Sequence, residues 1–162
     1  IYVAGVESQI GVVGADVRYY NADNWRDQDI WELALDGEIA KDLVLRGSYF
    51  YGDSDTVDGD DSGYLVGLSY RGAKASQPGS WGVYANYSDR PLSTFLEPTL
   101  FAGGYGIFPA DMISGDGYQG FDAGANVTLA KNIVAGVKYV DVESREGDTD
   151  TQTLWSEVIF TF

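Results

Sequence analysis

The sequence predicts an all-β fold, an antiparallel up-and-down transmembrane β-barrel, and we expect residues 1–162 to be its C-terminal portion with about nine strands. Three observations support this prediction. Apolar and polar residues alternate in nine segments, the links between the segments are alternately short and long, and the last twelve residues form an alternating strand that ends on Phe162. Outer-membrane barrels show such alternation, with aromatic residues at both membrane interfaces. We treat the whole chain as one domain.

The nine alternating segments are 1–7, 11–21, 30–40, 43–51, 63–71, 81–88, 118–129, 132–142 and 151–162. Side chains of a strand point alternately to opposite faces, so each segment has an apolar and a polar face. In chain order the apolar face carries Val13, Val17 and Tyr19, then Trp31, Leu33 and Leu35, then Leu45, Tyr49 and Tyr51, then Tyr64, Val66 and Leu68, then Trp81, Val83 and Tyr87, then Phe121, Ala125 and Val127, then Ile133, Val137 and Tyr139, and finally Leu154, Val158 and Phe160. A soluble sandwich would turn this face inward and a barrel in lipid would turn it outward, and alternation alone does not distinguish them.

The links between the segments favour the barrel. Links 7–10, 41–42, 72–80 and 130–131 are short, whereas links 22–29, 52–62, 89–117 and 143–150 are long. Short turns on one side and long loops on the other are typical of outer-membrane barrels. The long loops contain sixteen Asp or Glu residues and three Arg, while the short turns carry Lys41, Lys74 and Lys131. We therefore expect an acidic outer side and a more basic periplasmic side.

Composition excludes several functional classes. The chain has no Cys and no His, so it has neither thiolate metal sites nor Ser-His or Cys-His nucleophilic systems. Its net charge of −15 argues against nucleic-acid binding, which needs clustered Lys and Arg. No stretch approaches the ~20 apolar residues that a transmembrane helix needs. We expect no enzyme activity, no cofactor and no metal site.

The number of predicted strands indicates whether these residues form a complete barrel. If Phe162 ends at the periplasm, the first segment begins near the outer rim, whereas bacterial single-chain barrels have an even number of strands. We therefore expect a larger barrel of which this chain is the C-terminal part. The alternative is an eight-stranded barrel of segments 11–21 through 151–162, with the first segment as an N-terminal arm.

The stretch Leu129–Phe162 (LAKNIVAGVKYVDVESREGDTDTQTLWSEVIFTF) resembles the C-terminal end of the S-layer-homology-domain-tethered outer-membrane porins (OmpM-like) of diderm Firmicutes. The match is strongest at the Ala130-Lys131-Asn132 turn and at the closing LWSEVIFTF. The resemblance implies location in the bacterial outer membrane, a homotrimer, and tethering to the cell wall through an N-terminal domain that these residues do not include. It also implies recognition by the barrel-assembly machinery, for which we take Phe160 and Phe162 as the C-terminal signal.

A diffusion pore needs a polar, charged lining. We expect these residues to line it: Asp16, Arg18, Glu32, Asp36, Glu38, Arg46, Arg71, Asp122, Asn126, Lys138 and Glu157. Charged inward positions favour a channel, because a small closed barrel fills its interior with side chains. The alternative for any one of them is a charge that only pairs with a neighbour on a wetted wall.

The link 89–117 is unusually long and apolar. We expect it to enter the barrel mouth as a constriction, or to latch onto a neighbouring subunit, through Leu92, Phe95, Leu100, Phe101 and Phe108. Long loops in compact folds usually have a function. The alternative is a cap packed only on itself.

These observations together predict an outer-membrane porin that allows passive diffusion of small hydrophilic solutes and ions. Two alternatives stay open at this point. One is a small closed outer-membrane barrel that serves as an anchor or adhesion surface, and the other is a soluble β-sandwich or lipocalin-like binding protein.

Overall fold

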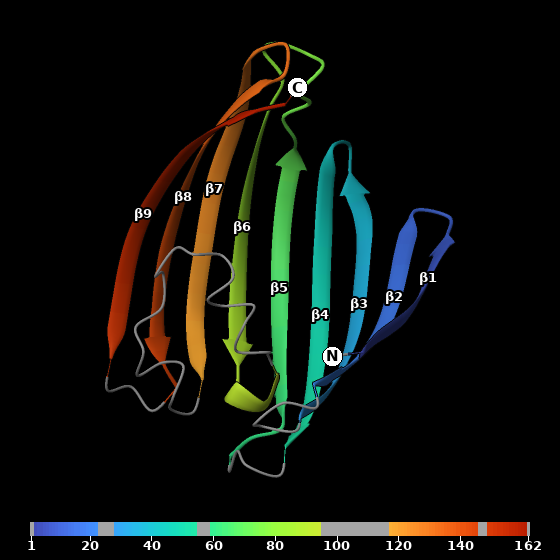
Figure 1. Ribbon diagram of the computed structural model, residues 1–162. Helices are drawn as coiled ribbons and strands as arrows, with labels where there is room; N and C mark the ends of the chain where they lie inside the picture. Colours follow the sequence, from blue (N-terminus) through green and yellow to red (C-terminus); the bar gives the residue numbers. More distant parts are fainter. Residues whose placement is uncertain (1, 23–27, 55–58, 95–116, 146–148, 162) are drawn as a thin grey trace.

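The computed structural model describes residues 2–22, 28–54, 59–94, 117–145 and 149–161. It is an all-β structure of nine antiparallel strands in one sheet, in the order of the chain (Figure 1). The strands are β1 (Tyr2–Ile10), β2 (Val13–Ala22), β3 (Gln28–Ala40), β4 (Leu43–Ser54), β5 (Ser62–Arg71), β6 (Trp81–Arg90), β7 (Tyr118–Ala130), β8 (Ile133–Ser144) and β9 (Asp150–Phe160), with one 3-10 turn, η1 (Leu92–Thr94), after β6. The predicted all-β, up-and-down arrangement is confirmed.

The predicted segments all coincide with strands, but several boundaries differ: β2 begins at Val13 and not at residue 11, β3 begins at Gln28 and not at residue 30, and β4 ends at Ser54 and not at residue 51. The turn between β1 and β2 was also placed wrongly. We had placed the first link at residues 7–10, whereas β1 continues to Ile10 and turns at Gly11 and Val12. Gly11 has φ +65°, a conformation that glycine adopts at little cost. Asp42 and Asn132 hold the other two-residue turns with φ of 61° and 66°, and Asn and Asp are the side chains that tolerate this region best.

The sheet is strongly curved, and β1 and β9 form its two margins (Figure 1). Because consecutive strands are antiparallel, the four two-to-nine-residue connections lie at one end, here called the turn end, and the other four lie at the opposite loop end. The C-terminus lies at the turn end and the N-terminus at the loop end. The described strands do not close into a barrel, since strand pairing stops at β1 and β9.

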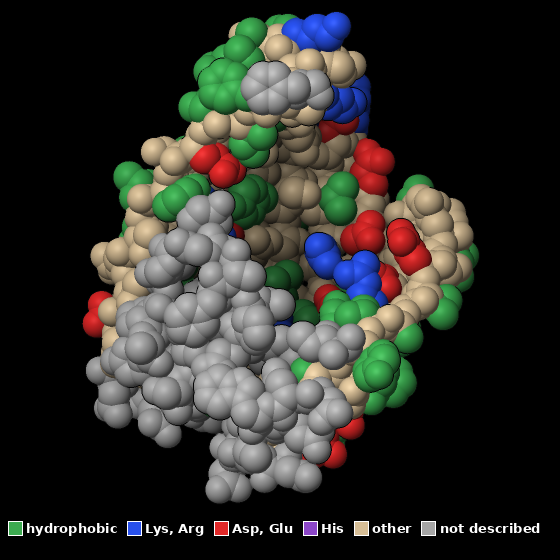
Figure 2. Space-filling view, in the orientation of Figure 1, with side chains coloured by type: hydrophobic (Ala, Val, Ile, Leu, Met, Phe, Trp, Pro, Cys, Tyr) green, Lys and Arg blue, Asp and Glu red, His purple; other side chains and the backbone are tan. Residues whose placement is uncertain are grey.

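Strand register makes each face continuous across the sheet. On the convex face, Leu33 lies between Val17 and Tyr49, and Tyr49 lies next to Tyr64. This face is exposed although it is apolar: Leu33 keeps 46% and Tyr49 52% of its surface accessible. The concave face carries charged and polar residues, and the view in Figure 2 looks into it.

Among the described residues few apolar side chains are buried, and those that are lie mainly on the concave face near the loop end. Ala22 and Ile30 pack together beside Tyr20, and Val140 and Val142 pack beside Tyr118. The sheet therefore has no extensive apolar core of its own. No helix in the described part of the chain is long and apolar enough to cross a membrane.

Candidate functional site: the concave wall

The structure brings five of the predicted lining residues together on β2, β3 and β4. Asp16, Arg18, Asp36 and Arg46 line one cavity of about 320 Å³ with Glu7 of β1, and Glu32 lies beside Arg18 in the register. Basic and acidic side chains lie next to each other on this part of the concave surface (Figure 2). An ion pair joins Arg18 to Asp16. This half of the wall therefore presents both signs of charge to the same space.

The lining residues of β7, β8 and β9 form a separate, sparser group. Asp122 accepts a hydrogen bond of 3.2 Å from the Asn86 amide. Lys138 lies opposite Gly124 and Glu157 opposite Gly136. Within the described residues, no ion pair joins Lys138 or Glu157 to another side chain. The structure thus does not bring this group into contact with the charges of β2–β4.

Glycines on the concave face leave room for neighbouring side chains to lie flat, a feature that we did not predict. A Cβ at Gly14 would be 2.6 Å from Asp36 Oδ1, and one at Gly124 would be 2.6 Å from the Tyr84 ring. The Asn86 amide covers Gly67 in the same way. The glycines could have been recognised in the sequence by their repeated occurrence at polar-face positions.

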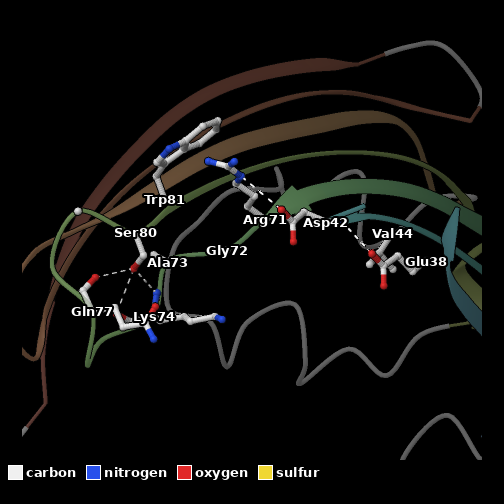
Figure 3. A pocket seen from close by; sticks show the side chains of 11 residues that line it. Glu38, Asp42, Val44, Arg71, Gly72, Ala73, Lys74, Gln77, Ser80 and Trp81 are labelled. Carbon is white, nitrogen blue, oxygen red and sulfur yellow. Dashed lines mark hydrogen bonds and ion pairs between the residues drawn. The ribbon is translucent and has the colours of Figure 1, made fainter. Parts of the chain in front are cut away.

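Arg71 and Glu38 lie at the turn-end rim and not along the middle of the wall (Figure 3). Arg71 has φ +58°, and its guanidinium carbon lies 5.2 Å from the ring centres of both Tyr70 and Trp81. Its Nε is 3.7 Å from Asp42 Oδ2, while Glu38 Oε1 accepts a hydrogen bond of 2.9 Å from the Asp42 amide. Arg71 is thus an aromatic-stacked residue of the rim, which its strand parity did not predict.

Asn126 has a structural contact that the sequence did not predict. Its Oδ1 accepts a hydrogen bond of 2.9 Å from the Ala73 backbone N–H, although the two residues are 53 positions apart. The side chain of Asn126 therefore holds the β5–β6 connection against β7. Its role as a pore-lining residue stays a prediction.

The described start of the 89–117 link bends onto the concave face at the loop end. Leu92 is buried, and its carbonyl accepts a hydrogen bond of 3.3 Å from Gln28 Nε2. Ser93 Oγ donates to the Asp60 carbonyl at 2.9 Å, and its backbone lies directly over Gly52. The other residues of the predicted constriction or latch, Phe95, Leu100, Phe101 and Phe108, lie outside the described residues. The constriction or latch remains a prediction.

Arg90 fixes this bend and was missed in the sequence, where it counted only as a loop charge. Its guanidinium lies over the Phe50 ring, 3.5 Å from the ring centre. Its Nε donates a hydrogen bond of 3.0 Å to Thr94 Oγ1, and its Nη2 donates to the Thr94 carbonyl. The only hint in the sequence was an arginine followed by proline at the end of an alternating segment.

Aromatic side chains form two bands on the convex face. At the loop end, ring pairs follow one another along the sheet: Tyr19–Trp31, Tyr64–Tyr87 and Phe121–Tyr139, with centres 4.8, 6.2 and 6.0 Å apart. At the turn end, Tyr70 and Trp81 lie 5.9 Å apart. Phe160 also lies exposed at the turn end, whereas Phe162 is outside the described residues.

The described residues bring no cluster of metal-binding side chains together. No three Asp or Glu side chains among them come together closely enough to hold a metal ion. Comparison with protein-family models finds no match, and comparison with curated protein sequences finds none either. The case for function therefore depends on the two faces of the sheet.

Proposed function

We propose that this chain forms part of the wall of an outer-membrane porin that allows passive diffusion of small hydrophilic solutes and ions. The observation that carries the proposal is the exposed apolar convex face, which continues through all nine strands. Its large side chains include Val17, Leu33, Tyr49, Leu68, Val83, Phe121, Val137 and Leu154, each at least 41% exposed. Exposed apolar surface of this extent marks a membrane or protein interaction site.

The two aromatic bands support a lipid environment for this face. Tyr and Trp are enriched at membrane interfaces because one end of each ring is apolar and the other forms hydrogen bonds. Tyr19 shows this directly, since its ring packs on Trp31 while its hydroxyl donates a hydrogen bond of 2.6 Å to Asp29. The bands would mark the two membrane interfaces, and because outer-membrane barrels have their short turns in the periplasm, the acidic loop end would lie outside.

The concave face supports diffusion better than anchoring. Charges such as Asp16, Arg18 and Arg46 border open space and are not sealed inside a packed interior. A wall of this kind acts on solutes through its charge and its narrowest point, and it needs no catalytic group. The partners that belong to this proposal are outer-membrane lipid, two further copies in a homotrimer, and the barrel-assembly machinery. Tethering to the cell wall would require a domain that the described residues do not contain.

The test is single-channel conductance of the protein after folding in detergent and insertion into a planar lipid bilayer. Steady steps proportional to salt concentration are expected, in triplets for a trimer. If a folded and inserted barrel carries no measurable current, the result would contradict the porin and favour the anchor or adhesion alternative. A monodisperse protein in detergent-free buffer, with no partition into vesicles, would instead favour the soluble β-sandwich.

A further inference from the structure

The β5–β6 connection, Gly72–Ser80, is the longest link at the turn end, and it bends inward over the concave face. We call these residues the shelf. The bend starts at Arg71, whose positive φ is uncommon for a residue other than glycine. It places Gly72 directly over Gly82 of β6, and a Cβ added to Gly82 would lie 2.6 Å from the Gly72 Cα. Gly82 belongs to the concave face, so the chain turns toward the space that the sheet encloses.

The shelf then crosses β7 and is held there by concave-face side chains. The Ala73 N–H donates to Asn126 Oδ1 at 2.9 Å, and Thr128 Oγ1 donates to the Lys74 carbonyl at 3.0 Å. Thr128 is only 1% exposed, because the shelf covers it. Beyond β7, the backbone N–H of Asn132 in the β7–β8 turn donates to the Ala75 carbonyl at 2.7 Å. The shelf therefore reaches from the end of β5 to the β7–β8 turn.

Internal hydrogen bonds make the shelf a defined structure. Ser80 Oγ accepts from the Lys74 N–H at 2.7 Å and donates toward the carbonyl of Gln77 at 2.7 Å. The Gln77 N–H donates to the Lys74 carbonyl at 2.8 Å, which closes a turn between them. Figure 3 shows these bonds gathered around Ser80, with Lys74 extending away from them.

Lys74 is the charged residue that this arrangement presents. Its side chain is exposed and borders a cavity of about 510 Å³ together with Glu38, Asp42 and Arg71 at the rim. Asp42 lies near Arg71, at 3.7 Å, and Glu38 accepts the Asp42 amide. Among the described residues no carboxylate lies within ion-pair distance of the Lys74 ammonium. Its charge is thus available to a passing ion.

The geometry points to the shelf as a narrow element of the pore, at its periplasmic mouth, with Lys74 as the residue that sets the local preference for small anions such as carboxylates and phosphate. This inference rests on the proposed porin function. It places the Lys74 ammonium at the end opposite the acidic loops, beside a rim where Glu38, Asp42 and Arg71 carry charges of both signs.

The first test is charge reversal at Lys74. An ammonium about 5 Å from an ion's path changes the local ion concentration by roughly fourfold in water, and screening in ~0.1 M salt reduces this. Lys74→Glu should therefore raise the cation-to-anion permeability ratio, taken from the reversal potential in a salt gradient, by at least about twofold. Lys41→Glu is the matched control, because Lys41 is an exposed turn-end lysine outside the shelf. An equal effect of both variants, or no effect of either, would overturn the inference.

The second test uses the absence of cysteine from the chain. Lys74→Cys and Lys41→Cys each carry a single thiol, which a negatively charged methanethiosulfonate reagent labels. Labelling of Lys74→Cys, verified by mass, should reduce the single-channel conductance in discrete steps, and labelling of Lys41→Cys should not. Complete labelling at Lys74→Cys without a change of current would refute the shelf as a narrow element. A wild-type protein without channels would refute the porin itself, which is a different outcome.

Discussion

Leu68 and Ser69 offer a direct test of which face of the sheet meets lipid. They are consecutive residues of β5, so they lie at the same depth and point to opposite faces. Leu68 lies between Leu45 and Ala85 on the convex face and is 42% exposed. Ser69 lies on the concave face and borders the cavity that Arg46 also lines. The two variants to compare are Leu68→Arg and Ser69→Arg.

The expected magnitudes differ strongly between lipid and water. Leu68 lies between the two aromatic bands, since Tyr64 and Tyr70 of the same strand belong to the loop-end and turn-end bands. An arginine on the lipid face near mid-membrane costs about 2–4 kcal/mol. At a 42% exposed position in water, the same substitution would change stability by about 0.5 kcal/mol or less. Ser69→Arg should be nearly neutral in either case, because it enters solvated space.

The assay is reversible unfolding by guanidinium in phospholipid vesicles, followed by tryptophan fluorescence. Leu68→Arg should reduce the folded-to-unfolded equilibrium constant about 30-fold or more, and Ser69→Arg should leave it within a few-fold. The reasoning fails if the two variants are destabilised equally. It also fails if Leu68→Arg is neutral in vesicles, because the convex face would then be facing water.

Three further predictions concern the two inward bends and the loop-end ion pairs. Gly82→Ala should lower the free energy of unfolding by about 1–3 kcal/mol, because the added Cβ would lie 2.6 Å from the shelf backbone. Gly136→Ala is the control and should be tolerated, because the atom nearest to its Cβ would be 3.6 Å away. Denaturant titration of both variants tests this difference. Arg145→Ala removes ion pairs of 2.7 and 2.8 Å and should cost about 1 kcal/mol at low salt, with a smaller loss at high salt. Arg90→Lys keeps the charge but loses the planar stacking on Phe50, and it should cost about 1–2 kcal/mol in the same titration; a neutral result would mean that stacking contributes little.

The fold could be predicted from the sequence because a strand's alternation is a local property. Val13 to Tyr19 and Trp31 to Leu35 show their faces without reference to the rest of the chain. The same property located the charged wall of β2–β4. The β1 boundary was missed because Gln9 and Ile10 fit a link as well as a strand, and only the positive φ of Gly11 places the turn.

The inward bends could not be predicted in this way, because they depend on contacts between residues far apart in the chain. Asn126 alternates correctly for a lining residue, yet its amide oxygen binds a backbone group 53 positions away. Arg71 has the parity of the concave face, but its positive φ turns its guanidinium onto Tyr70 and Trp81. A link of nine residues between two strands does not itself show whether it points away from the sheet or back over it.

The side chains that lie flat over glycines affect how solutes would move past this wall. Asp36 rests over Gly14, Asn86 over Gly67 and Tyr84 over Gly124, so each polar group runs along the sheet and does not project from it. The polar groups at these three places therefore remain close to the backbone and take up little of the enclosed space. In the proposed pore, the width of the passage beside them would be set by the sheet itself and by the two inward bends at its ends. A solute too large to pass would then be stopped at an end and not in the middle.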